Sequence, residues 1–204
     1  MNTRRKITLF AVIGILLALP LVALAQGMQG NNGQGRGRGN MFNNRQRLQM
    51  HNCTSDQIGM GYLCNLPDAV PGDLSDEVIE AMTNGIMDEY NAYNIYQAVI
   101  NQFGEVRPFT AIQQAEVQHI LAWEMLFNRY GVELPEMPAV DESLTFDSLS
   151  SACTAAAIAE VANFDLYDQM LVTLQDYPDM VWVVTNLRNA SEFHHLPAFE
   201  RCAR

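Results

Sequence analysis

The sequence predicts an all-α protein, built as an antiparallel four-helix bundle of two helical hairpins. Apolar residues recur at helical spacing through four segments, and strand-like alternation is nowhere sustained. The connections within the first and second pairs of segments are short, which favours antiparallel neighbours. The chain has 204 residues, 49% of them apolar, so one domain with a sizeable core is expected.

The first hairpin has the clearest expected boundaries. Its first helix is expected at 75–102, because Ser75 is a good N-cap and Gly104 follows the end. Its second helix is expected from Pro108, which suits a first turn, to Tyr130, with Gly131 as the stop.

The second hairpin follows a link of about 15 residues, long enough for a crossover along the bundle. Its first helix is expected to start near Asp147 or Ser148 and to run through an alanine-rich stretch to about Leu174. The last helix follows Pro178 and reaches the end region of the chain. Pro197 removes a backbone donor, so it is expected to kink or end that helix.

The N-terminal part predicts export. Residues 1–25 resemble a signal peptide, with three basic residues, an uncharged run and the small-residue triplet Ala23-Leu24-Ala25 before the expected cleavage site. An uncleaved membrane anchor is the alternative, since the run is about the length that spans a bilayer. Residues 26–50 are rich in Gly, Asn and Arg and predict a disordered linker before the domain at 51–204. The protein is therefore expected to be secreted or held at the cell surface.

The charge distribution makes nucleic-acid binding by the domain an unfavourable interpretation. From residue 51 onward the chain has 5 Arg and all 23 acidic residues, a formal net charge of −18. Such a surface repels phosphates and attracts cations, although it also serves solubility alone.

A repeated pattern predicts a metal site. In each half of the domain a Glu is followed seven residues later by a Tyr. A Glu-x-x-His begins 27 or 32 residues after that same Glu. The first set is Glu89, Tyr96, Glu116 and His119, and the second is Glu160, Tyr167, Glu192 and His195. Because residues three apart share a helix face, each half offers three ligands to one interior point.

Four carboxylates around one buried point repel one another unless cations neutralise them. We therefore predict two iron ions, with manganese or zinc as alternatives. Glu89 and Glu160 are expected as terminal ligands and Glu116 and Glu192 as bridging ligands, while His119 and His195 bind one ion each. The plainer interpretation is a solvated charge pattern, or a bundle without metal.

Tyr96 and Tyr167 lie two turns from the first Glu of each set. They are candidates for hydrogen bonds to carboxylates or for electron transfer, but the preferred interpretation is core tyrosines with one satisfied hydroxyl.

The four cysteines of an exported chain favour disulfides. If Glu160 is level with His195, Cys153 and Cys202 are each displaced seven residues, about 10 Å, in the same direction. We therefore predict Cys153–Cys202, which leaves Cys53 to pair with Cys64.

With these residues in place, the chain from about Leu74 to Phe199 resembles the ferritin-like superfamily, and within it the rubrerythrin-like di-iron carboxylate proteins. It is most similar to the uncharacterised ferritin-like family called domain of unknown function 2202. The resemblance depends on Glu89 to Tyr96, Ala115-Glu116-Val-Gln-His119, Ile158-Ala-Glu160 and His195-Leu-Pro-Ala-Phe199. It implies a di-iron bundle that reacts with oxygen or peroxide.

Two classes of function remain open from the sequence. The first is a redox enzyme of peroxidase or ferroxidase type, whose electrons come from an unknown separate donor or from Fe(II) itself. The alternative is a bundle outside the cytoplasm that binds metal without turnover, or that is purely structural. A homodimer is compatible with the sequence, which establishes no closed cage.

Overall fold

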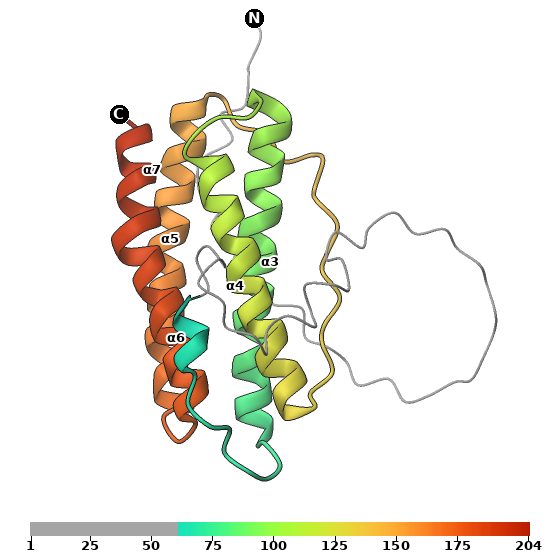
Figure 1. The fold of residues 1–204 in the computed structure, drawn as a ribbon. Coiled ribbons are helices and arrows are strands. Elements are labelled where there is room, and N and C mark those ends of the chain that lie inside the picture. The colour runs from blue at the N-terminus through green and yellow to red at the C-terminus, as the bar shows by residue number, and fades with distance from the viewer. Residues whose placement is uncertain (1–60) are drawn as a thin grey trace, which may run out of the picture.

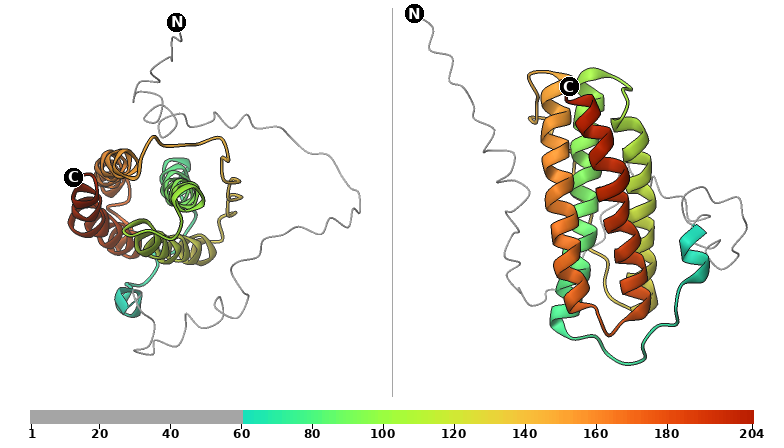
Figure 2. Two further views of the ribbon diagram at one scale, coloured as in Figure 1. Left: turned by 90° about the horizontal axis from the view of Figure 1, so that it is seen from above. Right: turned by 90° about the vertical axis from the view of Figure 1, so that its left-hand side faces the viewer.

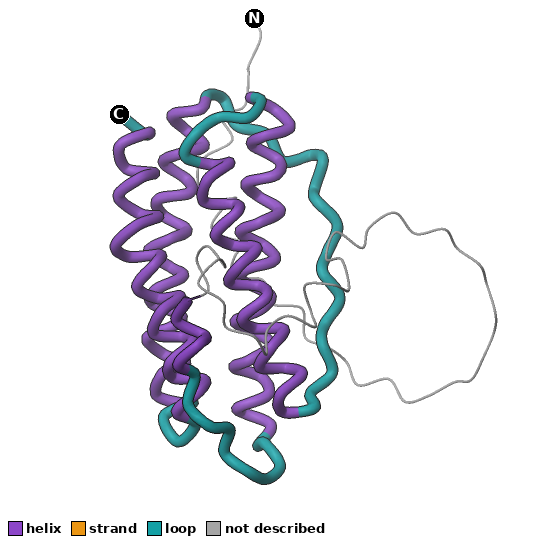
Figure 3. Tube along the Cα trace, in the orientation of Figure 1, coloured by secondary structure: helices purple, strands orange, loops and turns teal. Residues whose placement is uncertain are grey.

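The computed structural model describes residues 61–204, and every regular element in that part of the chain is a helix (Figures 1 and 3). The elements are η1 (Gly61–Asn65), α3 (Asp76–Phe103), α4 (Phe109–Tyr130), α5 (Leu149–Thr173), α6 (Pro178–Ala190), the π-helical turn η2 (Ser191–His195) and α7 (Leu196–Cys202). The all-α prediction is confirmed. Within this described part, no helix has the length and apolar character needed to cross a membrane.

The helices run side by side as two antiparallel pairs (Figures 1 and 2). The first pair is α3 and α4, and the second is α5 with the continuous rod formed by α6, η2 and α7. Residues 131–148 connect the pairs and run along the outside of α3 (Figure 3). Asn94 of α3 donates to the Pro138 carbonyl at 2.8 Å, and Gln102 makes two hydrogen bonds with the backbone of Phe146, at 2.7 and 2.9 Å. The long link is thus held against the first pair.

The helix ends lie within two residues of the expected positions because the local capping signals act as expected. The Ser75 side chain accepts from the Val78 N–H at the start of α3. Gly131 adopts the left-handed conformation after α4, with φ 66°. Ser148 and Ser151 form a capping box at the start of α5.

The last rod differs from expectation near Pro197. The proline neither ends the rod nor leaves a break, because a π-helical turn precedes it and the Leu196 N–H donates to the Ser191 carbonyl five residues back. From Leu187 onward the buried residues of this rod are Leu187, Ser191, His195 and Phe199, which follow one another at intervals of four. In an α-helix each such step rotates the face by about 40°, or about 120° over three steps. The wider π turn offsets much of this drift, so all four side chains face the core.

The core consists of two apolar clusters, one toward each end of the bundle. One surrounds Trp123 and includes Met82 and Met180, and the other surrounds Phe109 and Phe199. On α3, for example, the first cluster takes residues 78–90 and the second takes 96–99. On α4, α5 and the last rod the polar residues described below lie between the two clusters, and on α3 they lie at the inner edge of the first cluster.

Cys153 and Cys202 form a disulfide between α5 and α7, with their Cα atoms 5.7 Å apart, which confirms the predicted pairing. In the chain-entropy model, closing a loop of 49 residues stabilises the fold by about 4 kcal/mol. The predicted signal peptide and linker lie outside the described residues, as does Cys53 of the predicted Cys53–Cys64 pair.

Asp179, at the start of α6, is a fully buried carboxylate with a structural role. One of its oxygens accepts from the Tyr130 hydroxyl at 2.7 Å and from the Met180 N–H at 3.0 Å, and the other lies 3.4 Å from Arg129 Nε. The Tyr130 hydroxyl also accepts from the Val70 N–H at 3.2 Å. These contacts fasten α4, α6 and the segment before α3 together.

Candidate metal centre

Five of the six predicted ligands meet in the middle of the bundle. Glu89 comes from α3, Glu116 and His119 from α4, Glu160 from α5 and His195 from η2. All five are at most 6% exposed. They form two triplets that share Glu116: Glu89, Glu116 and His119, and then Glu116, Glu160 and His195. Within each triplet the donor atoms lie within 4.8 Å of one another, so each can hold a metal ion.

Glu116 occupies the shared position because its two oxygens face different histidines. Its Oε2 lies 2.7 Å from His119 Nδ1, and its Oε1 lies 3.3 Å from His195 Nδ1. His119 Nδ1 also lies 3.3 Å from Glu89 Oε2, and His195 Nδ1 lies 3.5 Å from Glu160 Oε2. The two imidazoles are stacked with their centroids 5.4 Å apart. Glu116 is therefore the one carboxylate that lies within reach of both histidines among the described residues.

Glu192 is a correction to the sequence-based prediction, which gave it the second bridging position. Its carboxylate is partly exposed and pairs with Arg188, which also binds Asp168 of α5 at 2.7 Å. The π turn explains the difference, because the wider turn rotates Glu192 away from the face that carries His195. The arrangement therefore has three central carboxylates rather than four.

The two tyrosines of the repeat donate hydrogen bonds to the carboxylates, in a crossed arrangement. Tyr96 of α3 donates to Glu160 Oε1 of α5 at 2.6 Å, and Tyr167 of α5 donates to Glu89 Oε1 of α3. Both are buried, as the preferred interpretation expected, but their hydroxyls are satisfied by the candidate ligands themselves. Burial, reinforced by the nearby carboxylates, raises the pKa of both phenols well above the usual value. They therefore remain protonated donors.

The ionisation of the buried groups is strongly perturbed. Burial raises the pKa of Glu89 to about 8, against the opposing effect of His119. Burial also favours a raised pKa at Glu116, but His195 and His119 outweigh it and hold that pKa below the usual range. For the imidazoles burial acts to lower the pKa; the carboxylates reverse this, raising the pKa of His195 to about 10 and that of His119 well above 6.5. The centre thus holds protons where a cation would fit.

The buried carboxylates and imidazoles are better arranged to bind a metal than to satisfy one another by hydrogen bonds. His195 Nδ1 is fully enclosed and has no hydrogen bond of acceptable geometry within residues 61–204, although two carboxylate oxygens lie within 3.5 Å of it. Buried polar atoms are rarely left in this state without a partner. Carboxylate and imidazole donors that converge on a point suit iron, manganese or zinc.

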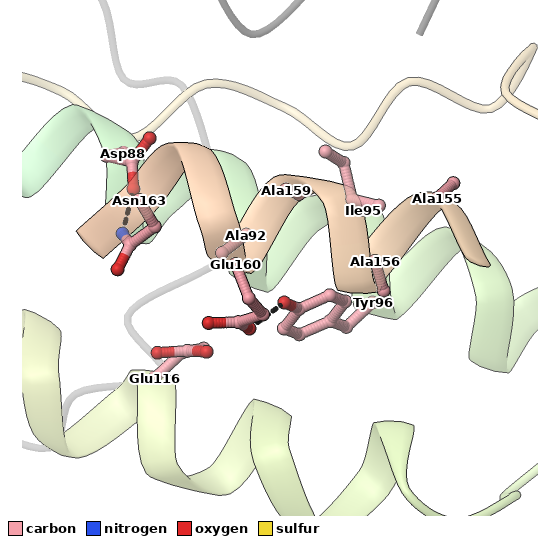
Figure 4. A pocket seen from close by; sticks show the side chains of 10 residues that line it. All are labelled: Asp88, Ala92, Ile95, Tyr96, Glu116, Ala155, Ala156, Ala159, Glu160 and Asn163. Atoms are coloured by element: carbon pink, nitrogen blue, oxygen red, sulfur yellow. Dashed lines mark hydrogen bonds between the residues drawn. The ribbon is translucent and has the colours of Figure 1, made fainter. Parts of the chain in front are cut away.

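Three polar residues beside the centre were missed by the sequence interpretation. Ser191 Oγ donates to Asn163 Oδ1 at 2.5 Å, and Asn163 Nδ2 donates to Asp88 Oδ2. Figure 4 shows Asp88 and Asn163 at one end of a cavity that reaches Glu160 and Glu116. Burial raises the pKa of Asp88 to about 6. The one signal in the sequence was the position of Asn163, three residues after Glu160 and therefore on the same helix face.

A scan of protein families found no matching model, and a search of curated proteins found no match. Among solved structures, the chain is similar to the crystal structure of the hypothetical protein MJ0754 from Methanococcus jannaschii. The TM-score is 0.57 and the identity 18%, with 67% of this chain and 85% of that chain covered. At this identity the likeness concerns the fold alone.

Proposed function

We propose that the protein is an exported redox enzyme that binds two metal ions, preferably iron, and reduces peroxide or oxygen with electrons from Fe(II). The observation that carries the proposal is the shared carboxylate of Glu116, placed between two buried Glu/His triplets. The resemblance to ferritin-like di-iron proteins supports the same function. The disulfide between Cys153 and Cys202 is compatible with a location outside the cytoplasm.

The five buried ligands would divide between two ion positions. Glu89 and His119 would hold one ion, Glu160 and His195 the other, and Glu116 both. Two ferrous ions held there would supply one electron each, enough to reduce one hydrogen peroxide, with two protons, to two water molecules. The Tyr96 and Tyr167 hydroxyls hold their protons toward Glu160 and Glu89 and fix the orientation of those carboxylates.

The charge balance favours a site that also accepts an outside molecule. Two divalent ions carry four positive charges, whereas Glu89, Glu116 and Glu160 supply three negative charges when ionised. Withdrawal of Glu192 toward Arg188 also removes one protein ligand. Fewer protein ligands leave coordination positions open, which catalysis at a metal requires.

The test is metal content in variants of the chain from residue 26 onward, loaded with Fe(II) without oxygen. We expect about two irons per chain in the wild type, about one in His119→Ala and in His195→Ala, and none held tightly in Glu116→Ala, because Glu116 serves both positions. Glu192→Gln is the matched control, since it neutralises a carboxylate of the same motif, and it should keep two irons.

Turnover is then measured by adding one equivalent of hydrogen peroxide per iron pair. Oxidation of both bound Fe(II) ions to Fe(III) by this one equivalent, with two water molecules as the product, supports the redox function. Two firmly bound irons that peroxide leaves ferrous would instead favour metal binding without turnover. A wild-type protein that binds no iron, manganese or zinc would refute the metal centre altogether.

A further inference from the structure

A small cavity between α3 and α5 leads to one half of the metal centre (Figure 4). Its volume is about 30 Å³. Four alanines form much of its wall, and two candidate ligands lie at its inner end: Ala92, Ala155, Ala156, Ala159, Glu116 and Glu160.

The cavity runs from the surface of the bundle to the centre. Ala92, Ala155 and Ala159 are partly exposed, whereas Glu116 and Glu160 are each 3% exposed. Glu89 and His119 do not line it. It therefore approaches the centre from the side of Glu160, at the ion position of Glu116, Glu160 and His195.

The volume limits what the cavity can hold. A space of about 30 Å³ accommodates one or two water-sized groups, because a single water needs roughly 10–15 Å³ on the same measure. Alanine side chains create this space, since any larger apolar residue at these positions would fill it. A molecule with two heavy atoms fits, and one with a branched alkyl group does not.

The wall also favours an uncharged molecule. Most of it is apolar, and Asp88, the one additional carboxylate among the described residues that line it, accepts a hydrogen bond from the Asn163 amide. An ion would lose its hydration against the alanines without compensation, and an anion would also be repelled by Asp88 and Glu160.

We propose that this alanine-lined cavity is the access route and binding site for an uncharged oxidant of two heavy atoms, hydrogen peroxide or dioxygen, at the Glu116, Glu160 and His195 position. The alanines then set the size limit of the reaction. This inference rests on the function proposed above and adds the route by which the oxidant enters and the residues that limit its size.

The first test uses nitric oxide, an uncharged diatomic molecule that binds ferrous ions, and follows its binding to the Fe(II)-loaded protein by visible absorbance. Ala159→Leu and Ala92→Leu should each slow this binding about tenfold or more while two irons are retained, because leucine would fill the cavity. Ala162→Leu is the matched control, since Ala162 is an exposed residue of the same helix outside the cavity, and it should bind nitric oxide at the wild-type rate.

The second test compares two peroxides in the wild-type protein and needs no variant to fold. Hydrogen peroxide should oxidise the bound Fe(II) about tenfold or more faster than tert-butyl hydroperoxide. Ala159→Gly should narrow that difference by widening the cavity.

The outcomes separate this inference from the proposed function. If both leucine variants keep two irons and bind nitric oxide at the wild-type rate, the cavity is not the access route, although the metal centre stands. Equal rates for the two peroxides would overturn the size limit. If the leucine variants take up Fe(II) more slowly but bind nitric oxide at the wild-type rate, the cavity is a route for ions, and the proposal is overturned. A wild-type protein without iron would instead refute the function itself.

Discussion

Gly85 shows how one residue position supports a distant ligand. It lies in the middle of α3, where glycine weakens a helix by about 1 kcal/mol relative to alanine. A Cβ atom at this position would lie 2.2 Å from Cζ2 and 2.6 Å from Cε2 of Trp123. The buried Trp123 Nε1 lies 3.5 Å from the Tyr167 hydroxyl, which donates to Glu89. Gly85 therefore allows the indole to pack against the helix backbone and to support the tyrosine that holds a candidate ligand.

We predict that Gly85→Ala destabilises the protein by about 1–3 kcal/mol, the usual range for overpacking, despite the better helix propensity of alanine. The measurement is urea unfolding followed by circular dichroism. Asn84→Ala is the matched control, because Asn84 is the adjacent, less buried position of the same helix, and it should leave the stability equal or slightly higher. Equal stability of Gly85→Ala and the wild type would show that Trp123 moves aside at a cost of only about 1 kcal/mol, the amount that alanine gains in helix propensity.

These residue-level contacts were only partly predictable from the sequence. Glu89, Glu116, His119, Glu160 and His195 were found because their spacing repeats between the two halves of the domain. Gly85 and Asp88 have no such spacing signal. Their partners, Trp123 and Asn163, lie on other helices, and only the packing of the helices brings them together.

Among the elements, α3 and α5 are joined at the centre by the two tyrosine–glutamate pairs. Each helix supplies one carboxylate and the hydroxyl that orients the carboxylate of the other helix. The sequence interpretation placed each Tyr beside the Glu of its own helix, seven residues away. Contact across the pair was not apparent, because the relative height of α3 and α5 depends on how the two hairpins, joined by residues 131–148, pack together.

We predict that Tyr167→Phe weakens the ion position of Glu89 and that Tyr96→Phe weakens the position of Glu160, each by about 10–100-fold in affinity. The measurement is a cobalt(II) titration followed by visible absorbance, in which one of two binding steps should shift in each variant. Tyr130→Phe is the control, since its hydroxyl binds Asp179 and lies outside the centre, and both steps should stay at the wild-type affinity. If neither step moves in either central variant, the hydroxyls do not orient the ligands.

The last rod shows where prediction from local signals ends. Caps and stops are properties of a few neighbouring residues, so α3, α4 and α5 were predicted within two residues. The π turn is instead a consequence of keeping Leu187, Ser191, His195 and Phe199 on one face, which depends on the neighbouring rods. The same turn removed Glu192 from the centre. The apparent symmetry of the two Glu-x-x-His motifs therefore does not extend to the fourth carboxylate.

Across the whole molecule, a strongly polar centre lies between two apolar clusters, in a domain whose described surface is acidic. Such a centre is costly without cations, because several ionisable groups are withdrawn from water together. Protons occupy it in the absence of metal: the pKa of Glu89 is raised to about 8 and that of His195 to about 10, and that of His119 lies well above 6.5. Metal binding must displace these protons, since carboxylate and imidazole bind metal in their deprotonated forms.

We therefore predict that binding of two zinc ions at pH 7 releases about two to three protons, one from His195 and the rest from the coupled pair of Glu89 and His119. The raised pKa values also make the metal affinity depend on pH. Each group is protonated below its folded-state pKa, so metal affinity should rise with pH from 7 and level off only near the pKa of about 10 of His195. Calorimetry in two buffers of different ionisation enthalpy measures the proton count. His195→Ala should release about one proton fewer, whereas Glu192→Gln should match the wild type, because Glu192 pairs with Arg188 outside the centre. Zinc binding without proton release in the wild type would show that the ions bind elsewhere, because these buried donors can bind zinc only after they lose their protons.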